Sequence, residues 1–319
     1  MLVSVIIPAY NDAEYLREAV QSALAQTYPH IEVIVVDDGS TDHTREVCES
    51  LGARVRYFYQ ENDGTQGIAA RGQAILQSRG YYIAFLDQDD RWLPTKIEQQ
   101  IAMFERYPDA GVVFTAYRLI DERGRVCSPV FPTGPTGDVF HDLLRRNWYC
   151  NASSLIPRRV IGRCGLPDPE SGMDDWDMWL HIARHYKVYV VDECLTEYRV
   201  HGDSTSADII KLLVRCRQMV PRQEVRLHPG CSECRRSWAL GSAVIAAGYL
   251  YHAALMARAG RPGKMLSSVG AFAELLMPRA LLPWNLWEVA RMLLDARNNS
   301  KAFKQSQVFI ERAVTGIER

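Results

Sequence analysis

The chain has 319 residues, 47% of them hydrophobic, so it is long and apolar enough to bury a large core. Its 37 basic and 38 acidic side chains nearly cancel, which excludes the strong net field typical of nucleic-acid-binding proteins. The first residues contain no basic leader with a cleavage site, and the eight cysteines are scattered. We therefore expect a cytoplasmic globular protein with reduced thiols and no nucleic-acid partner.

The first half of the chain alternates between strand and helix patterns. Runs rich in β-branched or aromatic residues predict strands at residues 3–7, 31–36, 55–59 and 81–86. Apolar residues at helical spacing predict helices at residues 16–24, 44–51, 68–77 and 97–107. Asn11 is expected to cap the first helix, with Glu14 completing a capping box. Buried strands joined by helices predict an α/β fold, namely a doubly wound, mostly parallel sheet covered on both faces.

The pattern changes after residue 115. A hairpin-like segment turning at Gly124, a Pro/Gly-rich loop at 128–137 and mixed elements up to residue 200 are expected to extend the sheet. From residue 208 the sequence is helical, with breaks at 228–230, 260–263 and 278–283. The prediction is one α/β domain at 1–207, with halves at 1–115 and 116–207, followed by a helical C-terminal extension at 208–319.

One apolar stretch, residues 238–257, approaches the length of a membrane span. It carries polar and small residues such as Ser242, Gly248 and His252, which favour a helix packed inside protein. Peripheral contact of the C-terminal helices with a membrane stays open at this point.

Polar side chains follow three of the predicted strands, in Pro8-Ala9-Tyr10, Asp37-Asp38-Gly39-Ser40 and Asp87-Gln88-Asp89-Asp90. In open α/β sheets, ligands bind beyond the carboxyl ends of the strands. Three carboxylates within four residues repel one another unless a cation is bound, and a hard divalent ion such as Mn²⁺ or Mg²⁺ prefers oxygen ligands. Such an ion would also bind a diphosphate. The alternative is that Asp89 or Asp90 only caps the helix that follows Pro94.

Five segments together resemble family 2 of the glycosyltransferases, which have the GT-A fold. They occur in the family's order and span residues 2–206: VSVIIPAYNDAEYLREAVQSALAQTYPHIEVIVVDDGSTDHT, GIAAR, FLDQDDRW, MDDWDMWLHIA and YRVHGDSTS. The resemblance implies inverting transfer of a sugar from a nucleotide-sugar donor, with a UDP-sugar favoured, to a hydroxyl of a glycan or lipid-linked acceptor. It also implies a role in cell-surface polysaccharide synthesis, in the cytoplasm or at the inner face of the membrane.

The resemblance implies that residues 1–207 are the catalytic domain, with 1–115 as its nucleotide-binding half and 116–207 as its acceptor-side half. It assigns nucleotide contacts to the ends of the first and second strands. Residues Pro8, Ala9 and Tyr10 resemble the segment that packs against the base and ribose. Asp38 resembles the carboxylate that binds the base edge, where it could accept a hydrogen bond from uracil N3–H. A turn or helix-capping aspartate is the alternative for Asp38.

Arg71 resembles an arginine of the nucleotide pocket, although Gly72 follows it where the family usually has Asn. A solvated helix arginine is an equally open interpretation. By the same resemblance, Asp87 lies near the ribose or metal-bound water, and Asp89 is the direct metal ligand of the Asp-x-Asp (DXD) motif. Asp90 is expected to lie next to Asp89 without binding the metal directly.

The acceptor side is represented by two further motifs. Asp175 aligns with the catalytic base, which takes the proton of the attacking hydroxyl, while Asp174 replaces the usual glutamate. The alternative is that both aspartates only stabilise a helix N-terminus. In Tyr198-Arg199-Val200-His201 the resemblance assigns His201 to the metal or diphosphate and Arg199 to the phosphates.

A separate pattern, His228-x2-Cys231-x2-Cys234, offers three metal ligands. A structural zinc site needs four, so Cys216 or His252 would have to join them through the fold. The sequence leaves open whether these residues bind a metal.

Two other enzyme classes and one non-enzyme class compete with this interpretation. A dehydrogenase lacks support because no G-x-G-x-x-G follows the first strand, and a sugar nucleotidyltransferase typically begins with a basic, glycine-rich phosphate loop that VIIPAYND lacks. A catalytically inactive nucleotide-sugar-binding module would need no acceptor-side base. The joint presence of Asp87, Asp89, Asp175 and His201 therefore favours an enzyme.

Overall fold

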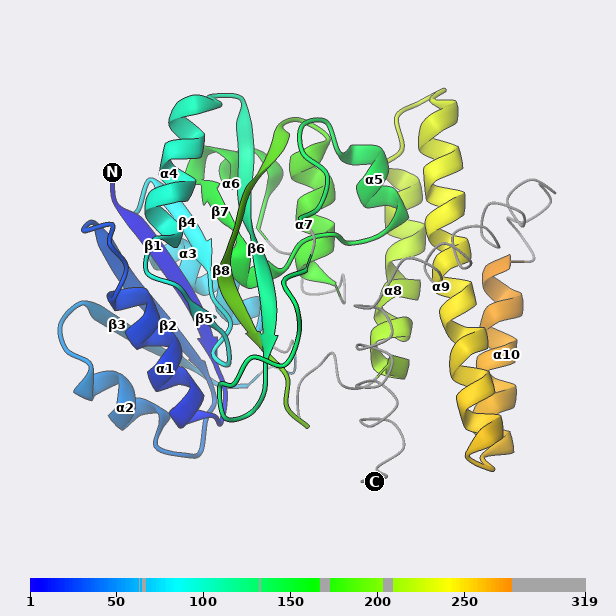
Figure 1. Cartoon of the computed structure of the whole chain (residues 1–319), viewed down its shortest axis with the longest axis horizontal. Coiled ribbons are helices and arrows are strands. Elements are labelled where there is room, and N and C mark those ends of the chain that lie inside the picture. Colours follow the sequence, from blue (N-terminus) through cyan, green and yellow to red (C-terminus); the bar gives the residue numbers. More distant parts are fainter. Residues whose placement is uncertain (63, 65–66, 132, 167–172, 203–208, 277–319) are drawn as a thin grey trace. The chain divides into compact units, whose positions relative to one another are not determined.

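The structure is a computed structural model that describes residues 1–276 except 63, 65–66, 132, 167–172 and 203–208 (Figure 1). The chain divides into two compact units, and each is described by itself. The first consists of Met1–Phe140, Trp148–Glu170 and Asp174–Arg199, and the second of His141–Asn147, Ser171–Met173 and Val200–Arg319. The expected boundary at residue 207 falls in an undescribed segment, so it stays a prediction.

The first unit is built on a mixed eight-stranded sheet of order β3-β2-β1-β4-β7-β6-β8-β5. The strands are β1 (Val3–Ala9), β2 (Ile31–Asp38), β3 (Val55–Gln60), β4 (Tyr82–Phe85), β5 (Arg91–Trp92), β6 (Ala110–Ile120), β7 (Leu155–Pro157) and β8 (Lys187–Arg199). Strands β3, β2, β1 and β4 are parallel, whereas β7 is antiparallel to both β4 and β6. Strand β8 is parallel to β6 and antiparallel to β5.

Helices cover both faces of the sheet, as predicted. They are α1 (Ala13–Leu24), α2 (Thr44–Ser50), α3 (Ile68–Gln77), α4 (Lys96–Arg106), α6 (Arg158–Cys164) and α7 (Asp174–Ala183), with a 3₁₀ turn η1 at Asn151–Ser153. Val3, Val5 and Ile7 of β1 share one core cluster with α1 and α4. The alternate residues point to the other face, where Pro8 meets Gly67 at the start of α3.

The expected cap of the first helix is wrong. Helix α1 begins at Ala13, and Asp12 occupies the N-cap position. Asn11 instead adopts a left-handed backbone conformation with φ of 47°, and its Oδ1 accepts a hydrogen bond from Thr41 N at 2.7 Å. Asparagine tolerates this conformation better than most residues, so its side chain is free to bind the loop after β2 instead of the helix.

The second unit is helical. It contains α8 (Ile209–Val225), α9 (Ser232–Arg258) and α10 (Pro262–Leu276). Most of α5 (Phe140–Arg145) also belongs to this unit. Helix α9 packs against α8, where Trp238 Nε1 donates to Val220 O at 2.9 Å, and against α10, where His252 bonds Ser268 at 2.8 Å. The predicted breaks near 228–230 and 260–263 are confirmed, and the one at 278–283 lies outside the described residues.

Helix α9 contains the apolar stretch noted in the sequence. With 27 residues it is long and apolar enough to cross a membrane, but 61% of its most apolar segment is buried inside the protein. A core helix passes the same length test. The burial agrees with the packed helix that the sequence predicts.

Candidate active site

Three strand ends meet at one edge of the sheet. Strand β1 pairs in parallel with β2 and with β4, with Ala9 opposite Asp37 and Ile6 opposite Phe85. Because parallel strands end on the same side, the residues that follow Ala9, Asp37 and Phe85 are brought together. This edge therefore collects Tyr10, the Asp37-Asp38 pair and the Asp87–Asp90 segment.

A glutamine side chain ties two of these strand ends together. Gln88 Oε1 accepts a hydrogen bond from Tyr10 N at 2.7 Å, and Gln88 Nε2 donates to Tyr10 O at 3.0 Å. The side chain thus makes the pair of bonds that a neighbouring strand would make. Ala9 is buried, while Tyr10 is 49% exposed, so its ring can contact a ligand.

The two aspartates at the end of β2 have different surroundings. Asp37 uses both carboxylate oxygens inside the protein, accepting from Ser40 N at 2.8 Å and from the Tyr57 hydroxyl at 2.6 Å. Asp38 accepts from Gln60 Nε2 at 2.6 Å through Oδ1. Among the described residues, none donates a hydrogen bond to Asp38 Oδ2. Asp38 therefore keeps the carboxylate oxygen that a ligand could use.

The turn after Asp38 requires glycine. Gly39 has φ of +85°, and an added Cβ would lie 2.8 Å from Asn62 N. The left-handed conformation and the close backbone both exclude a larger side chain. This turn presents Asp38 and Ser40 at the strand end.

Arg71 lies inside the site and is not a solvated helix arginine. Its Nη2 is 2.6 Å from Asp87 Oδ1, and the Arg71 side chain is only 13% exposed. Asn151 Nδ2 lies 3.4 Å from both carboxylate oxygens of Asp87. Helix α3 and turn η1 therefore position Asp87 from two sides.

Asp90 is the most deeply buried carboxylate of the acidic segment. Its Oδ1 accepts from Arg199 N at 2.8 Å, while Oδ2 has no hydrogen-bond donor among the described residues. Burial raises the pKa of Asp90 well above its usual range, and the charges of Asp89 and Asp87 raise it further. The segment thus gathers three carboxyl groups, one of them with an unpartnered buried oxygen, and this donor set fits a hard divalent cation with oxygen ligands.

The structure gives Arg199 a different task from the predicted phosphate contact. The residue is completely buried, and its guanidinium hydrogen-bonds the following groups: Asp89 O (2.7 Å), Asp121 O (3.3 Å), Glu122 O (3.1 Å) and Glu18 Oε2 (2.6 Å). With no exposed surface it cannot touch a phosphate in this conformation. It fixes the backbone of the acidic segment instead.

Helix α7 carries the predicted base. Asp175 is half-buried in its first turn and accepts a hydrogen bond from Trp176 N at 2.6 Å. The helix is anchored by buried Trp176 and Trp179, and the Trp179 ring meets Phe114 of β6 edge-on at 4.8 Å. This face of the helix is therefore packed against the sheet.

Cys150 connects Asp175 with the acidic segment. Burial raises the pKa of its thiol well above the usual range, and the charges of Asp90, Asp87 and Asp175 raise it further. The thiol therefore lies within electrostatic reach of all three carboxylates.

The predicted roles of His201, of Asp174 and of the loop at 203–206 are not tested by the structure. His201 follows β8 by two residues and belongs to the second unit, so its metal ligation stays a prediction. The side chain of Asp174 and the loop residues 203–206 lie outside the described part of the structure.

Three supporting residues were not predicted: Glu18, Gln88 and Asn151. Gln88 was visible as the middle residue of Asp-Gln-Asp, but its bonds to Tyr10 depend on how β1 and β4 pair. Glu18 and Asn151 carry no motif, because each reaches the site through tertiary packing alone.

Comparison with known proteins identifies the family. Residues 4–161 match the family described as glycosyl transferase family 2. The chain is 34% identical over 233 residues to TuaG of Bacillus subtilis, whose name assigns it to teichuronic acid biosynthesis; the match covers 71% of this chain and 90% of TuaG. It is also 34% identical over 233 residues to the Escherichia coli protein WfaP, a UDP-Glc:alpha-D-GlcNAc-diphosphoundecaprenol beta-1,3-glucosyltransferase, covering 71% and 88%. The chain belongs to glycosyl transferase family 2.

Solved structures show the fold. Residues 1–349 of S. aureus TarS in complex with UDP superpose with a TM-score of 0.63 at 17% identity, covering 99% of this chain and 92% of that one. The mannosyltransferase PcManGT from Pyrobaculum calidifontis, in complex with GDP-Man and Mn²⁺, gives 0.58 at 18% identity, covering 99% and 88%. The GT-A fold predicted from the sequence is confirmed.

Some relatives are longer than the region they share with this chain. An uncharacterised glycosyltransferase of Rickettsia typhi is 37% identical over 211 residues, which cover 64% of this chain and 66% of that protein. A second, from Rickettsia felis, is 36% identical over 217 residues, which cover 65% of this chain and 36% of that protein.

Proposed function

We propose that this chain transfers a sugar from a UDP-sugar to a hydroxyl of a glycan or lipid-linked acceptor, with inversion at the anomeric carbon. The observation that carries the proposal is the convergence of Tyr10, Asp38, Arg71 and the Asp87–Asp90 segment at one sheet edge of a family 2 chain. WfaP, named for a UDP-Glc donor and a diphosphoundecaprenol-linked acceptor, supports both substrate classes.

The nucleotide would bind across the ends of β1 and β2. The exposed Tyr10 ring offers an aromatic face to the base, and Pro8 and Ala9 form the strand end beneath it. Asp38 can accept from uracil N3–H through Oδ2, since Gln60 holds Oδ1. Arg71 adds a positive charge beside Asp87 at the nucleotide side.

A Mn²⁺ or Mg²⁺ ion is part of the proposal. Asp89 and His201 would hold it, with Asp87 toward the ribose or metal-bound water and Asp90 behind. When bound, the ion supplies positive charge that stabilises the departing diphosphate. PcManGT, solved with Mn²⁺, supports a divalent metal in this fold.

Asp175 would act as the base in a single displacement. Its carboxylate takes the proton of the acceptor hydroxyl as that oxygen forms a bond to the anomeric carbon and the bond from that carbon to the diphosphate oxygen breaks. The products are a glycoside of inverted configuration and a nucleoside diphosphate. The hydrogen bond from Trp176 N and the buried tryptophans of α7 fix the position of this carboxylate.

The location is proposed from the same relatives. A lipid-linked acceptor of the WfaP type would place the enzyme in the cytoplasm at the inner face of the membrane. Peripheral contact through the C-terminal helices would be sufficient for access to such an acceptor.

The test is a donor screen followed by variants. With Mn²⁺ and a lipid-linked glycan acceptor, a UDP-sugar should give nucleoside diphosphate release. Asp175→Asn should lower turnover about 10²- to 10⁴-fold while donor affinity, measured by calorimetry, stays unchanged. Asp192→Asn, on an exposed position of β8, is the matched control and should behave as wild type.

The outcomes separate the parts of the proposal. Normal turnover by Asp175→Asn would show that another group is the base, and exclusive use of GDP-sugars would overturn the uracil assignment. Asp89→Asn should abolish the metal-dependent part of donor binding, and unchanged Mn²⁺ dependence would remove Asp89 from the metal site. Donor binding without release under any condition would indicate a non-catalytic binding module.

A further inference from the structure

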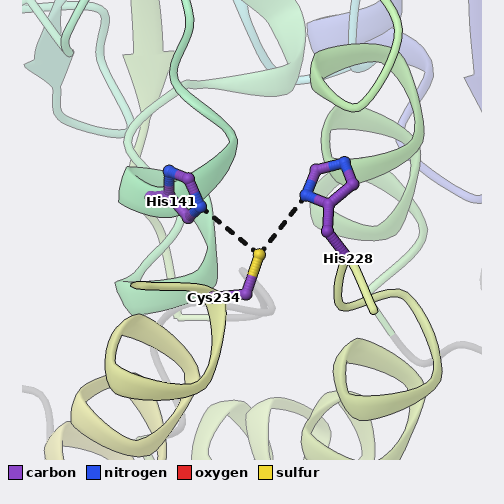
Figure 2. A group of neighbouring side chains, drawn as sticks. All are labelled: His141, His228 and Cys234. Carbon is purple, nitrogen blue, oxygen red and sulfur yellow. Dashed lines mark hydrogen bonds between the residues drawn. The ribbon is translucent and has the colours of Figure 1, made fainter. Parts of the chain in front are cut away.

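The second unit contains a cluster of thiol and imidazole groups that sugar transfer does not use. Cys234 Sγ lies 3.3 Å from His141 Nε2 and 3.3 Å from His228 Nδ1, and Figure 2 shows the three side chains converging. Cys231 Sγ lies 3.7 Å from the same His141 nitrogen. His141 is 93 residues before Cys234 in the chain, so only the fold could reveal it as the fourth member.

We propose that His141, His228, Cys231 and Cys234 form a structural site for one Zn²⁺ ion. The site is separate from the acidic segment, and it does not depend on the proposed glycosyl transfer. Its four donors, two sulfurs and two nitrogens, are the set that zinc prefers over Mn²⁺, Mg²⁺ or Ca²⁺.

The distances fit a tetrahedral ion. Zinc–sulfur bonds of about 2.3 Å and zinc–nitrogen bonds of about 2.0–2.1 Å place neighbouring ligand atoms roughly 3.3–3.8 Å apart. The three sulfur–nitrogen distances here are 3.3, 3.3 and 3.7 Å. His141, His228 and Cys234 present ligand atoms within 4.8 Å of one another, so one ion can contact these three with little movement, and Cys231 completes the set by moving toward the ion.

The surroundings prepare each ligand for a cation. Cys231 is the N-cap of α9 and accepts a hydrogen bond from Cys234 N at 3.3 Å. The N-terminus of a helix stabilises negative charge, such as that of a metal-bound Cys231 sulfur. His141 turns its other nitrogen, Nδ1, toward Glu233 Oε2 at 3.8 Å, and zinc-bound histidines usually have such a carboxylate partner.

The sequence offered Cys216 or His252 as the fourth ligand, whereas the structure brings His141 to the sulfurs. His252 is buried and hydrogen-bonds Ser268 at 2.8 Å. A redox-active Cys231–Cys234 dithiol is the competing interpretation, because such pairs also occur at helix N-termini. Two imidazoles directed at the sulfurs favour a metal, since disulfide chemistry requires neither.

Metal content is the first test. The full chain, purified untagged and without chelators, should contain one zinc per molecule by plasma mass spectrometry. His141→Ala and Cys234→Ser should lose it, whereas Cys127→Ser, an exposed thiol of the first unit, should keep it. Zinc-free wild-type protein that also fails to take up added Zn²⁺ would overturn the proposal.

Cobalt substitution keeps the proposal testable if those variants fold poorly. Wild-type protein stripped of metal under reducing conditions should take up one Co²⁺ with the near-ultraviolet charge-transfer absorption that arises only from sulfur ligation, so the carboxylate site cannot produce it. Glu233→Gln should retain the metal with about 10- to 100-fold lower affinity. A Cys231–Cys234 disulfide in freshly isolated protein, with no cobalt–sulfur absorption after reduction, would show a redox pair instead.

Discussion

The side chain of Gln88 hydrogen-bonds both the N–H and the C=O of Tyr10, so the middle residue of Asp-Gln-Asp aligns the nucleotide strand with the acidic segment. Gln88→Ala removes both bonds. At about 0.5–1.5 kcal/mol each, the loss should weaken donor binding roughly tenfold.

Calorimetric titration with the donor measures the Gln88 effect. Gln88→Glu should be impaired as well, because its carboxylate can accept from Tyr10 N but has no N–H for Tyr10 O. Gln21→Ala, exposed on α1, is the control. Donor affinity equal to wild type in Gln88→Ala would mean that β1 and β4 hold this segment without the side chain.

At the scale of single residues, the sequence predicted which side chains collect at the sheet edge better than it predicted their bonds. Asp38, Arg71 and Asp87 lie at this edge because their motifs follow strands, or begin a helix, beside the parallel strands β1, β2 and β4. Arg199 differs because its burial depends on Glu18 and on backbone carbonyls around residue 121, which no motif specifies.

Helix α4 supports the site through buried polar groups. Gln100 Nε2 donates to Val113 O at 2.7 Å and to Ser153 O at 2.8 Å, while its Oε1 accepts from Lys96 Nζ at 2.9 Å. Lys96 lies 4.0 Å from the Trp92 ring centroid, and burial lowers the pKa of its ammonium group well below the usual range. The network holds turn η1, which carries Asn151 to Asp87.

Removing the Gln100 side chain should therefore affect both stability and the site. Gln100→Ala leaves buried groups without their partner and should lower the free energy of unfolding by about 2–4 kcal/mol. Gln99→Ala, whose bonds to Thr95 and Glu193 are at the surface, should cost less than about 1 kcal/mol. Urea unfolding measures both, and equal values for the two variants would contradict a supporting role of the network.

Elements with strong local patterns were predicted within a few residues. Strands β1 to β4 and helices α1 to α4 have long apolar runs or clear helical spacing. Strands β5 and β7 and helices α5 and α6 were missed, because two to seven residues carry too little periodicity and their form is set by neighbours.

At the scale of the whole molecule, the proposed zinc ion would stabilise one unit selectively. A ligand present at 100 times its dissociation constant adds about 2.7 kcal/mol to the folded state. Chelation should therefore speed amide hydrogen exchange in α5 and the first turns of α9, while β1 to β4 exchange as before. Hydrogen-exchange mass spectrometry measures this, and equal acceleration in both units would contradict a local structural role.

The path of the chain has a practical consequence for anyone who wishes to shorten or recombine this enzyme. Residues 141–147 belong to the helical unit, although Phe140 and Trp148 on either side belong to the first. Leu143 and Leu144 are fully buried, and Gly241 of α9 lies so close to the Leu144 carbonyl that any side chain there would overlap it. A truncated version ending at Arg199 would expose these leucines to solvent, so a hybrid with a foreign tail should exchange this seven-residue segment together with the helices.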